Sequence, residues 1–342
     1  MKPTDFSYYL TNYLSIYLPG QQGVSVNTVK SYRDTFMLLL RFCKDEKGII
    51  PEKLSINLLK PDVFEDFLNW LESERHCGIS TRNQRLTAIR SFYKYLQYEC
   101  PEQLLYIQKI ISIPLKRQPS TLFPYLTLDG IKAILQQPDT TTRNGYRDLV
   151  LLSLLYDTGA RVQELADIKI GDVRFISPAT IRLEGKGRKA RIVPLMTQSA
   201  VLLEEYLLRY YPNYSQILAN PLFCSRGKNK LTRSGISYIL SKYANMARID
   251  HSELILSNVT PHVFRHSKAM HLLEAGVNLI YIRDVLGHVN IKTTEIYARA
   301  DADMKRKALE TAYQSALPTS SAPSWQTDTE LLVWLQNLGK TN

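Results

Sequence analysis

Three prolines within one short basic stretch divide the chain into two parts of different character. The stretch SIPLKRQPSTLFPYLT, residues 112–127, shows no helical spacing of apolar residues. Proline has no backbone N–H to donate and interrupts regular elements, so this composition is typical of an extended linker. We therefore expect two domains, residues 1–112 and 127–315, joined by a linker at 113–126. In a chain of 342 residues, each domain is large enough to bury a core of its own.

The part before the linker is predicted to be a bundle of helices. Its apolar residues recur at the 3.6-residue spacing of an amphipathic helix. Gly48 and Gly78 are expected to end the first two long helices, and Ser80 or Thr81 to cap the third. The corresponding sequence segments are 25–48, 60–78 and 79–100.

The third of these segments carries a polar face that is rich in arginine. Arg82, Asn83, Arg85, Arg90 and Lys94 lie on it. The face is consistent with a solvated helix surface and also with insertion into the major groove of DNA.

After the linker the pattern becomes mixed, though helices still dominate. The segment IRLEGKGRKARIVPL predicts a β-hairpin whose strands, 181–183 and 191–193, flank a Gly-Lys-Gly turn. PLFCS, residues 221–225, is expected to be another short strand. The fold class is thus mainly α: a helical first domain and a mostly helical second domain with a small β-sheet. Helices of the second domain are expected at 128–137, 144–158, 161–167, 197–211, 232–248, 260–275 and 278–286.

Composition narrows the range of partners and compartments. The net charge of +11 favours an anionic partner. The four cysteines are scattered, which predicts reduced thiols and no zinc site. No apolar run reaches the roughly 18 residues that a membrane span needs, so we expect a cytoplasmic protein without a membrane partner.

The helix predicted at 260–275 begins with a cluster of cationic and titratable side chains. Thr260 is its expected cap and Pro261 its first helical residue. His262 and Arg265, three residues apart, then share one face near the helix N-terminus, where an anion is stabilised. His266 follows His262 by four residues, as in some metal sites, but no H-E-x-x-H pattern or nearby carboxylate supports a metal.

Two further basic positions stand where the chain turns. Arg161 follows Gly159 at the start of a helix, with Glu164 three residues later. This arrangement suits a surface ion pair, or a second arginine for the phosphate that Arg265 would bind. Lys186 lies between two glycines in the hairpin turn, whose flexible backbone would let it reach into a DNA groove.

Taken in order, the motifs of the second domain resemble those of a known family. TGARVQEL, EGKGRKARIVPL, TPHVFRHSKAMHLLEAG, VLGH and TTEIYA follow one another with the order and spacing found in the tyrosine recombinases, the phage-integrase and Xer-type enzymes. The resemblance is strong over residues 120–313 and weaker over 5–112, which is similar to the helical core-binding domain of that family.

The resemblance implies a covalent mechanism of DNA cleavage. Tyr297 would attack the scissile phosphate and form a 3′-phosphotyrosyl link. Arg161 and Arg265 would clamp the phosphate oxygens, a task that suits the fixed fork and permanent charge of arginine. Lys186 would protonate the departing 5′-hydroxyl.

Three more residues take supporting roles under the same resemblance. His262 would exchange the proton of the nucleophile or orient the phosphate, and His288 would donate a hydrogen bond to it. Glu164 would hold one of these side chains in place. No metal, ATP or other cofactor is implied, because the cations of the site would stabilise the transition state.

The implied partner is double-stranded DNA with inverted core sites, held in a C-shaped clamp. A helix at 327–342, tethered by a flexible linker at 316–326, would dock on a neighbouring protomer of a homo-tetramer, and accessory DNA-bending proteins are compatible with this assembly. Because the helical domain starts near residue 5, short core sites are expected. The residues predicted to contact DNA are Arg82, Asn83, Arg85, Arg90, Arg188, Lys189, Arg233 and Ser234.

Two other functions compete with recombination as interpretations of the sequence. A type IB topoisomerase would use the same residues to nick and reseal DNA, but it would not need the tethered terminal helix. A DNA-binding accessory protein without catalysis would lack one of the six core residues, and all six are present. The sequence leaves open whether the outcome is integration, excision, transposition or dimer resolution.

Overall fold

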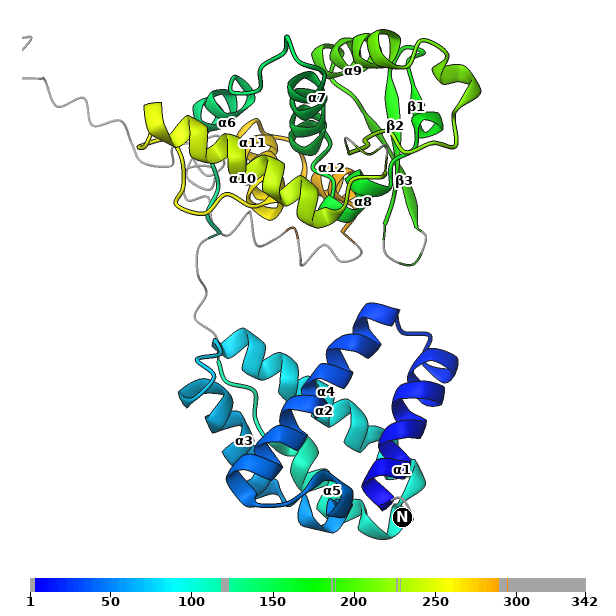
Figure 1. Cartoon of the computed structure of the whole chain (residues 1–342), viewed down its shortest axis with the longest axis vertical. Helices are drawn as coiled ribbons and strands as arrows, with labels where there is room; N and C mark the ends of the chain where they lie inside the picture. The colour runs from blue at the N-terminus through cyan, green and yellow to red at the C-terminus, as the bar shows by residue number, and fades with distance from the viewer. Residues whose placement is uncertain are drawn as a thin grey trace, which may run out of the picture. The chain divides into compact units, whose positions relative to one another are not determined.

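The chain divides into two compact units within its proline-rich stretch. The computed structural model shown in Figure 1 separates residues 1–121 from residues 122–342. Each unit has its own hydrophobic core. The structure describes residues 4–117, 123–185, 187, 189–225, 227, 229–288 and 294.

The first unit is a helical bundle, as its sequence predicts. Helix α2 (Val26–Lys47) begins after Ser25, whose hydroxyl accepts a hydrogen bond from the Thr28 amide, and ends at Gly48 with φ 67°. This left-handed glycine is the expected stop signal. The helices are α1 (Asp5–Asn12), a π-helical continuation (Tyr13–Gln21), α2 (Val26–Lys47), α3 (Pro61–Ser73), α4 (Ile79–Glu99) and α5 (Leu104–Ser112).

Aromatic rings fill the core of this bundle. Phe92 of α4 is completely buried. Its ring centroid lies 5.9 Å from that of Phe6, 5.2 Å from that of Tyr13 and 5.2 Å from that of Phe36. Such tilted and edge-on pairs stabilise beyond the area that they bury. Phe92 thus joins α1, the π-helical segment and α2 to α4.

The boundary between α3 and α4 differs from the sequence prediction. Helix α3 ends at Ser73, where we expected it to run on towards Gly78. His76 adopts a left-handed conformation with φ 49°, and the Cys77 amide bonds back to the Leu71 carbonyl. Gly78 is the N-cap of α4, so the predicted caps Ser80 and Thr81 lie inside the helix. Glycine has no side chain, so α4 begins without a side-chain cap.

The second unit is built around helix α7. Figure 1 shows α6, α10 and α11 on one side of α7, and α9 and the strands on the other. In the described part of the chain, no helix combines the length and the apolar character that crossing a membrane requires. The helices are α6 (Leu128–Leu135), α7 (Arg143–Thr158), α8 (Val162–Asp167), α9 (Thr197–Tyr210), α10 (Arg233–Asp250), α11 (Pro261–Glu274) and α12 (Leu279–Leu286).

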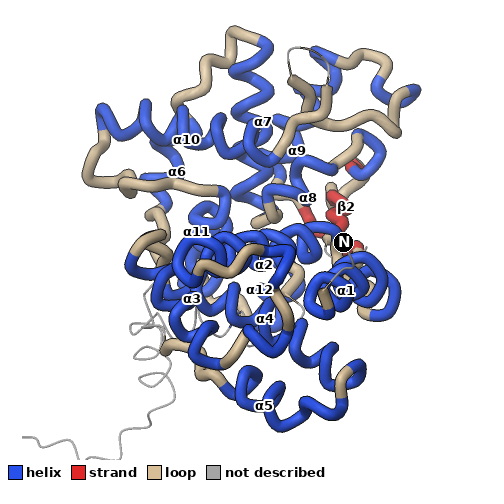
Figure 2. The backbone as a smooth tube through the Cα atoms, turned by 60° about the horizontal axis from the view of Figure 1, so that its bottom comes forward, coloured by secondary structure: helices blue, strands red, loops and turns tan. Residues whose placement is uncertain are grey.

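The predicted hairpin is present and belongs to a small antiparallel sheet of order β1-β2-β3. Strand β2 (Thr180–Glu184) pairs with β3 (Ala190–Pro194), and Leu183 lies opposite Arg191. The third strand is β1 (Val173–Arg174), which the sequence analysis did not identify. Figure 2 shows how little of the fold these strands occupy.

The prediction of a strand at PLFCS, residues 221–225, is wrong. Its residues form only two isolated bridges, Pro221 with Lys169 and Cys224 with Lys230. The segment is apolar because Leu222 and Phe223 point into the core. An apolar run of this length does not by itself distinguish a strand from a buried loop.

The aromatic core of the first unit gives a test of its packing. We expect Phe92→Ala to lower the free energy of unfolding of this unit by about 3–5 kcal/mol, because the lost ring leaves a cavity among three others. Tyr98→Ala on the same helix is the matched control, since Tyr98 is 81% exposed. Urea unfolding of the full chain should show a lower midpoint for the first variant only. Equal midpoints would contradict the central role given to Phe92.

Candidate active site

A tight turn between α7 and α8 presents Arg161. Gly159 ends α7 with φ 56°, and Arg161 is the N-cap of α8. A β-carbon at position 159 would lie 2.7 Å from a methyl group of Leu286. Glycine is therefore required both for the left-handed backbone and for the close approach of α12. The turn brings the start of α8 against the end of α12.

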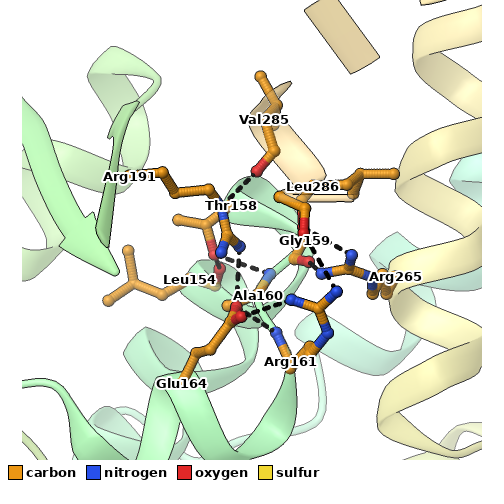
Figure 3. A network of polar contacts seen from close by, with 11 residues as sticks. Leu154, Thr158, Gly159, Ala160, Arg161, Glu164, Arg191, Arg265, Val285 and Leu286 are labelled. Atoms are coloured by element: carbon orange, nitrogen blue, oxygen red, sulfur yellow. Dashed lines mark hydrogen bonds and ion pairs between the residues drawn. The ribbon is translucent and has the colours of Figure 1, made fainter. Parts of the chain in front are cut away.

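The carboxylate of Glu164 is the centre of the polar network in Figure 3. The residue is 3% exposed. Its Oε1 accepts a hydrogen bond of 2.7 Å from Nη1 of Arg161. Its Oε2 accepts one of 2.9 Å from the backbone N–H of Arg161 and one of 2.8 Å from Nη2 of Arg191. The supporting role expected for Glu164 thus has a geometric basis, since it fixes Arg161 at both the main chain and the guanidinium.

These contacts determine how Glu164 ionises. Burial by itself would raise the pKa of this carboxyl, whereas the hydrogen bonds and charges of Arg191 and Arg161 lower it. The second effect is larger, and the pKa is lowered overall. Glu164 is therefore an anion at neutral pH and balances part of the surrounding positive charge.

Arg265, on α11, is held against the same turn. It is 3% exposed. Its Nη1 donates to the carbonyl of Gly159 at 2.6 Å and its Nη2 to the carbonyl of Leu286 at 2.6 Å. Both acceptors are main-chain atoms, and this guanidinium is therefore fixed by the fold itself.

Three arginines meet the C-terminal end of α12. The last carbonyls of a helix have no partner within the helix and carry partial negative charge. Here three successive carbonyls each accept from a different guanidinium. The close-up in Figure 3 labels the first two, Val285 and Leu286. The pairs are Val285 with Nε of Arg191 (2.8 Å), Leu286 with Nη2 of Arg265 and Gly287 with Nη2 of Arg161 (3.2 Å).

Helix α11 begins as the sequence predicts. Thr260 is its N-cap and accepts a hydrogen bond from the Val263 amide, and Pro261 is its first residue. His262 is exposed and Arg265 is buried one turn further along. Desolvation and the nearby charges of Arg265 and Arg161 lower the pKa of His262. The structure therefore brings the two arginines and this histidine into one electrostatic environment.

His288 directly follows the C-cap of α12. Its Nδ1 lies 2.9 Å from the hydroxyl oxygen of Thr294, a fully buried residue. Burial, followed by the charges of Arg265, Arg161 and Arg191, lowers the pKa of His288 to about 4. The imidazole is thus neutral at pH 7. If Nδ1 accepts the Thr294 proton, Nε2 carries the remaining proton and is a hydrogen-bond donor.

His266 lies beside this group. Its ring centroid is 5.1 Å from that of Phe123 and 6.3 Å from that of His262. Desolvation, His262 and Arg265 lower its pKa to about 4. Among the described residues, histidines, cysteines and carboxylates do not gather in groups of three or more that would hold a metal ion.

Several predicted site residues are outside the described part of the chain. These are Tyr297, Lys186 and Arg188. The base of the hairpin turn is described, and the Gly185 amide donates to the Lys189 carbonyl at 2.9 Å. A β-carbon at Gly185 would lie 3.1 Å from Oε1 of Glu164. The hairpin therefore starts against the carboxylate that holds Arg161.

The predicted DNA-contacting residues separate into two groups. Lys189, Arg233 and Ser234 are exposed, and the last two lie in the first turn of α10, which Thr232 caps. The candidates on α4 instead make hydrogen bonds within the first unit. Asn83 exchanges two with the backbone of Lys116, at 2.8 and 3.0 Å.

The three arginines of this second group are similarly engaged. Arg82 is 7% exposed and pairs with Glu72 at 3.4 Å. Arg85 donates to Ser31 and Thr35, and Arg90 to the Ile113 carbonyl. Helix α4 packs against α2, α3 and α5, so its polar face is largely covered by neighbours. Contact of these residues with DNA stays a prediction.

Arg191 is the site residue that the sequence analysis missed. Its position appeared there only as the first residue of the strand predicted at 191–193. The alternation of side chains along β3 could have indicated its role. Arg191 lies two residues before the buried Val193, so both side chains are on the same face of the strand. A charged residue on the inner face of a strand needs a buried partner, which here is Glu164.

Comparison with known proteins agrees with this geometry. Residues 124–304 match the sequence profile described as "Phage integrase family", and residues 10–99 match "Phage integrase, N-terminal SAM-like domain". "Putative integrase/recombinase y4rC" of Sinorhizobium fredii is 35% identical over 322 residues, 94% of this chain and 95% of that protein. "Tyrosine recombinase XerD" of Listeria innocua is 32% identical over 291 residues, 82% of this chain and 90% of that protein.

Solved structures share the fold. The XerH site-specific recombinase in a post-cleavage complex with palindromic difH substrate superposes with a TM-score of 0.65 at 22% identity, covering 85% of this chain and 80% of that one. The Tn1549 transposon integrase in complex with transposon right end DNA gives a TM-score of 0.65 at 17% identity, covering 88% of this chain and 98% of that one.

The lowered histidine pKa values give a test based on pH. Imidazoles of the unfolded chain bind protons near pH 6.5, whereas His266 and His288 in the folded chain do so only at about pH 4. The unfolded state therefore binds more protons between these values, and the free energy of unfolding of the second unit should fall as the pH is lowered through this window.

The variant His266→Gln isolates the contribution of one histidine to this pH dependence. Its free energy of unfolding should depend less steeply on pH between about 6.5 and 4, because one imidazole no longer differs between the two states. Urea unfolding at several pH values measures both slopes. Equal slopes for the variant and the wild type would show that His266 is not desolvated as described.

Proposed function

The chain belongs to the phage integrase family, the tyrosine recombinases, and is a site-specific DNA recombinase, and we propose that Tyr297 is the nucleophile with which it cleaves DNA. The observation that carries the proposal is the pair Arg161 and Arg265. Both guanidiniums are fixed by main-chain carbonyls at the end of α12. Fixed donors of this kind stabilise a charged transition state without the cost of reorganising them.

The proposed reaction is a transesterification. The hydroxyl oxygen of Tyr297 attacks the scissile phosphorus, the bond from phosphorus to the 5′-oxygen breaks, and a 3′-phosphotyrosyl link forms. Lys186 gives its proton to the leaving 5′-oxygen, and His262 takes the proton of the tyrosine. The lowered pKa of His262 supports this assignment, because the neutral imidazole has a free electron pair to accept a proton. Attack by the 5′-hydroxyl of another strand reverses these steps, so the phosphodiester energy is conserved and ATP is not consumed.

His288 is proposed to donate a hydrogen bond to a phosphate oxygen. The contact between its Nδ1 and the hydroxyl of Thr294 supports a tautomer with the proton on Nε2. Because the pKa of His288 is lowered, this donor is neutral and adds no charge of its own. Arg161, with 37% of its side chain exposed, supplies the accessible positive charge.

DNA binding by the two units is proposed to follow a clamp arrangement. The net charge of +11 and the exposed residues Lys189, Arg233 and Ser234 support contacts of the second unit with the duplex. The segment 327–342, outside the described residues, is proposed to dock on a neighbouring protomer in a homo-tetramer. Its apolar Leu331 and Trp334 lie in a short stretch beyond a Pro- and Ser-rich linker.

The proposed nucleophile is tested by covalent trapping. The probe is a nicked suicide duplex built on the site that the wild-type protein selects from a random-sequence DNA pool. Wild type should give a protein–DNA adduct that survives denaturation, and Tyr297→Phe should bind the same duplex without forming one. An adduct in the variant would assign the nucleophile elsewhere. No adduct with the wild type, despite tight binding, would favour the accessory DNA-binding function. Relaxation of supercoiled plasmid without exchange between two sites would favour the topoisomerase alternative.

Deletion of residues 326–342 tests the assembly. Binding to a single half-site should be nearly unchanged, because that contact uses the two units only. Formation of the synaptic complex should weaken at least tenfold, because an apolar docking contact is lost. Native gel shifts with half-site and paired full-site duplexes measure both. Unchanged synapsis by the truncated chain would exclude docking in trans.

A further inference from the structure

Arg191 joins two parts of the active site that are distant in sequence. It lies on β3, and 13% of its side chain is exposed. Its Nη2 donates to Oε2 of Glu164 at 2.8 Å, and its Nε donates to the carbonyl of Val285 at 2.8 Å. One side chain thus connects α8 with the end of α12.

The contact with Glu164 bears directly on Arg161. Oε2 of Glu164 receives both the Arg191 guanidinium and the Arg161 backbone N–H, while Oε1 receives the Arg161 guanidinium. The orientation of the carboxylate is therefore defined by Arg191 from one side and Arg161 from the other. Without Arg191, Glu164 would be a buried anion with a single cationic partner, and its carboxylate would be held only from the side of Arg161.

The contact with Val285 bears on the other half of the site. The carbonyls of Leu286 and Gly287 come next and accept from Arg265 and Arg161, and His288 follows. A β-carbon at Gly287, where φ is 65°, would lie 2.7 Å from Nη1 of Arg191. The turn and the guanidinium therefore fit against each other closely, and glycine provides the space.

We propose that Arg191 is a positioning residue for DNA cleavage, which acts through Glu164 and the 285–287 carbonyls to hold Arg161 and His288 in their reactive places. The planar fork of arginine suits this task, since it donates in two directions from fixed positions. A lysine at the same place would keep the charge but would present only one nitrogen. The inference rests on the proposed function, because it concerns the rate of the same reaction.

The experiment compares Arg191→Met and Arg191→Lys with the matched control Arg182→Met. Arg182 lies on the neighbouring strand β2, and 51% of its side chain is exposed, beside Asp172 and Glu184. For each full-length variant, the affinity for an uncleaved site duplex and the single-turnover rate of adduct formation on the suicide duplex are measured. The duplexes carry the site selected by the wild-type protein.

If Arg191 has a positioning role, its substitution should slow adduct formation and leave the affinity for the site duplex nearly unchanged. Arg191→Met should bind within about twofold of wild type, because phosphate contacts elsewhere dominate affinity. Its rate should fall on the order of 100-fold, the size expected when a reactive group is displaced by about 1 Å. Arg191→Lys should recover only part of the rate, and Arg182→Met should match wild type. If Arg191→Met does not fold, as judged by its thermal melt, Arg191→Lys carries the comparison, with a roughly tenfold slower rate expected at unchanged affinity.

A double variant with Glu164 tests whether Arg191 affects the cleavage rate through this carboxylate. If Arg191 acts through this carboxylate, the double variant Arg191→Lys/Glu164→Gln should cleave no more slowly than the slower single variant. The inference would be overturned if the rate losses of the two single variants multiply in the double variant. It would also be overturned if affinity and rate fall in parallel, or if Arg191→Lys cleaves at the wild-type rate. Absence of an adduct with the wild type would instead contradict the proposed function.

Discussion

The candidate active site is organised around one buried carboxylate, that of Glu164. Removing a charge from water costs several kcal/mol in real proteins, and the cost is recovered only if partners fill its hydrogen-bonding positions. Glu164 meets this condition with two guanidiniums and one backbone amide. The residues that satisfy it come from α8 and β3, so the requirement to pair this one charge aligns elements that the chain forms far apart.

The arginines around Glu164 keep a net positive charge, and their mutual repulsion is offset by neighbouring groups. Three guanidiniums lie near one carboxylate, and the remaining compensation comes from the carbonyl dipoles at the end of α12. Dipoles lower the energy of a cation but do not cancel its charge. Burial, followed by this excess of positive charge, lowers the pKa values of the neighbouring imidazoles of His262 and His288 and keeps them neutral. A phosphate entering this region would therefore meet fixed positive charge beside two neutral imidazoles.

Local signals in the sequence were sufficient for most of the helices and for part of the site. The pair Thr260–Pro261 marked the start of α11, and with it the positions of His262 and Arg265. Contacts between residues far apart in the sequence could not be predicted from such local signals. Nothing near Arg191 indicates that its partners lie 27 residues before and 94 residues after it. The surroundings of the polar face of α4 could not be predicted for a related reason. The spacing of Asn83 and Arg90 is the same whether they face solvent or the segment at 113–116.

The use of main-chain acceptors also affects how this site tolerates sequence change. A carbonyl oxygen persists whatever side chain its residue carries, so substitutions at Val285 and Leu286 leave the anchors of Arg191 and Arg265 in place. Substitution is instead unfavourable at two kinds of position. These are Gly159 and Gly287, whose missing side chains allow the close approach, and the single carboxylate of Glu164. A lineage carrying this site is thus free to vary the packing of α12 against its core while these few positions stay constant.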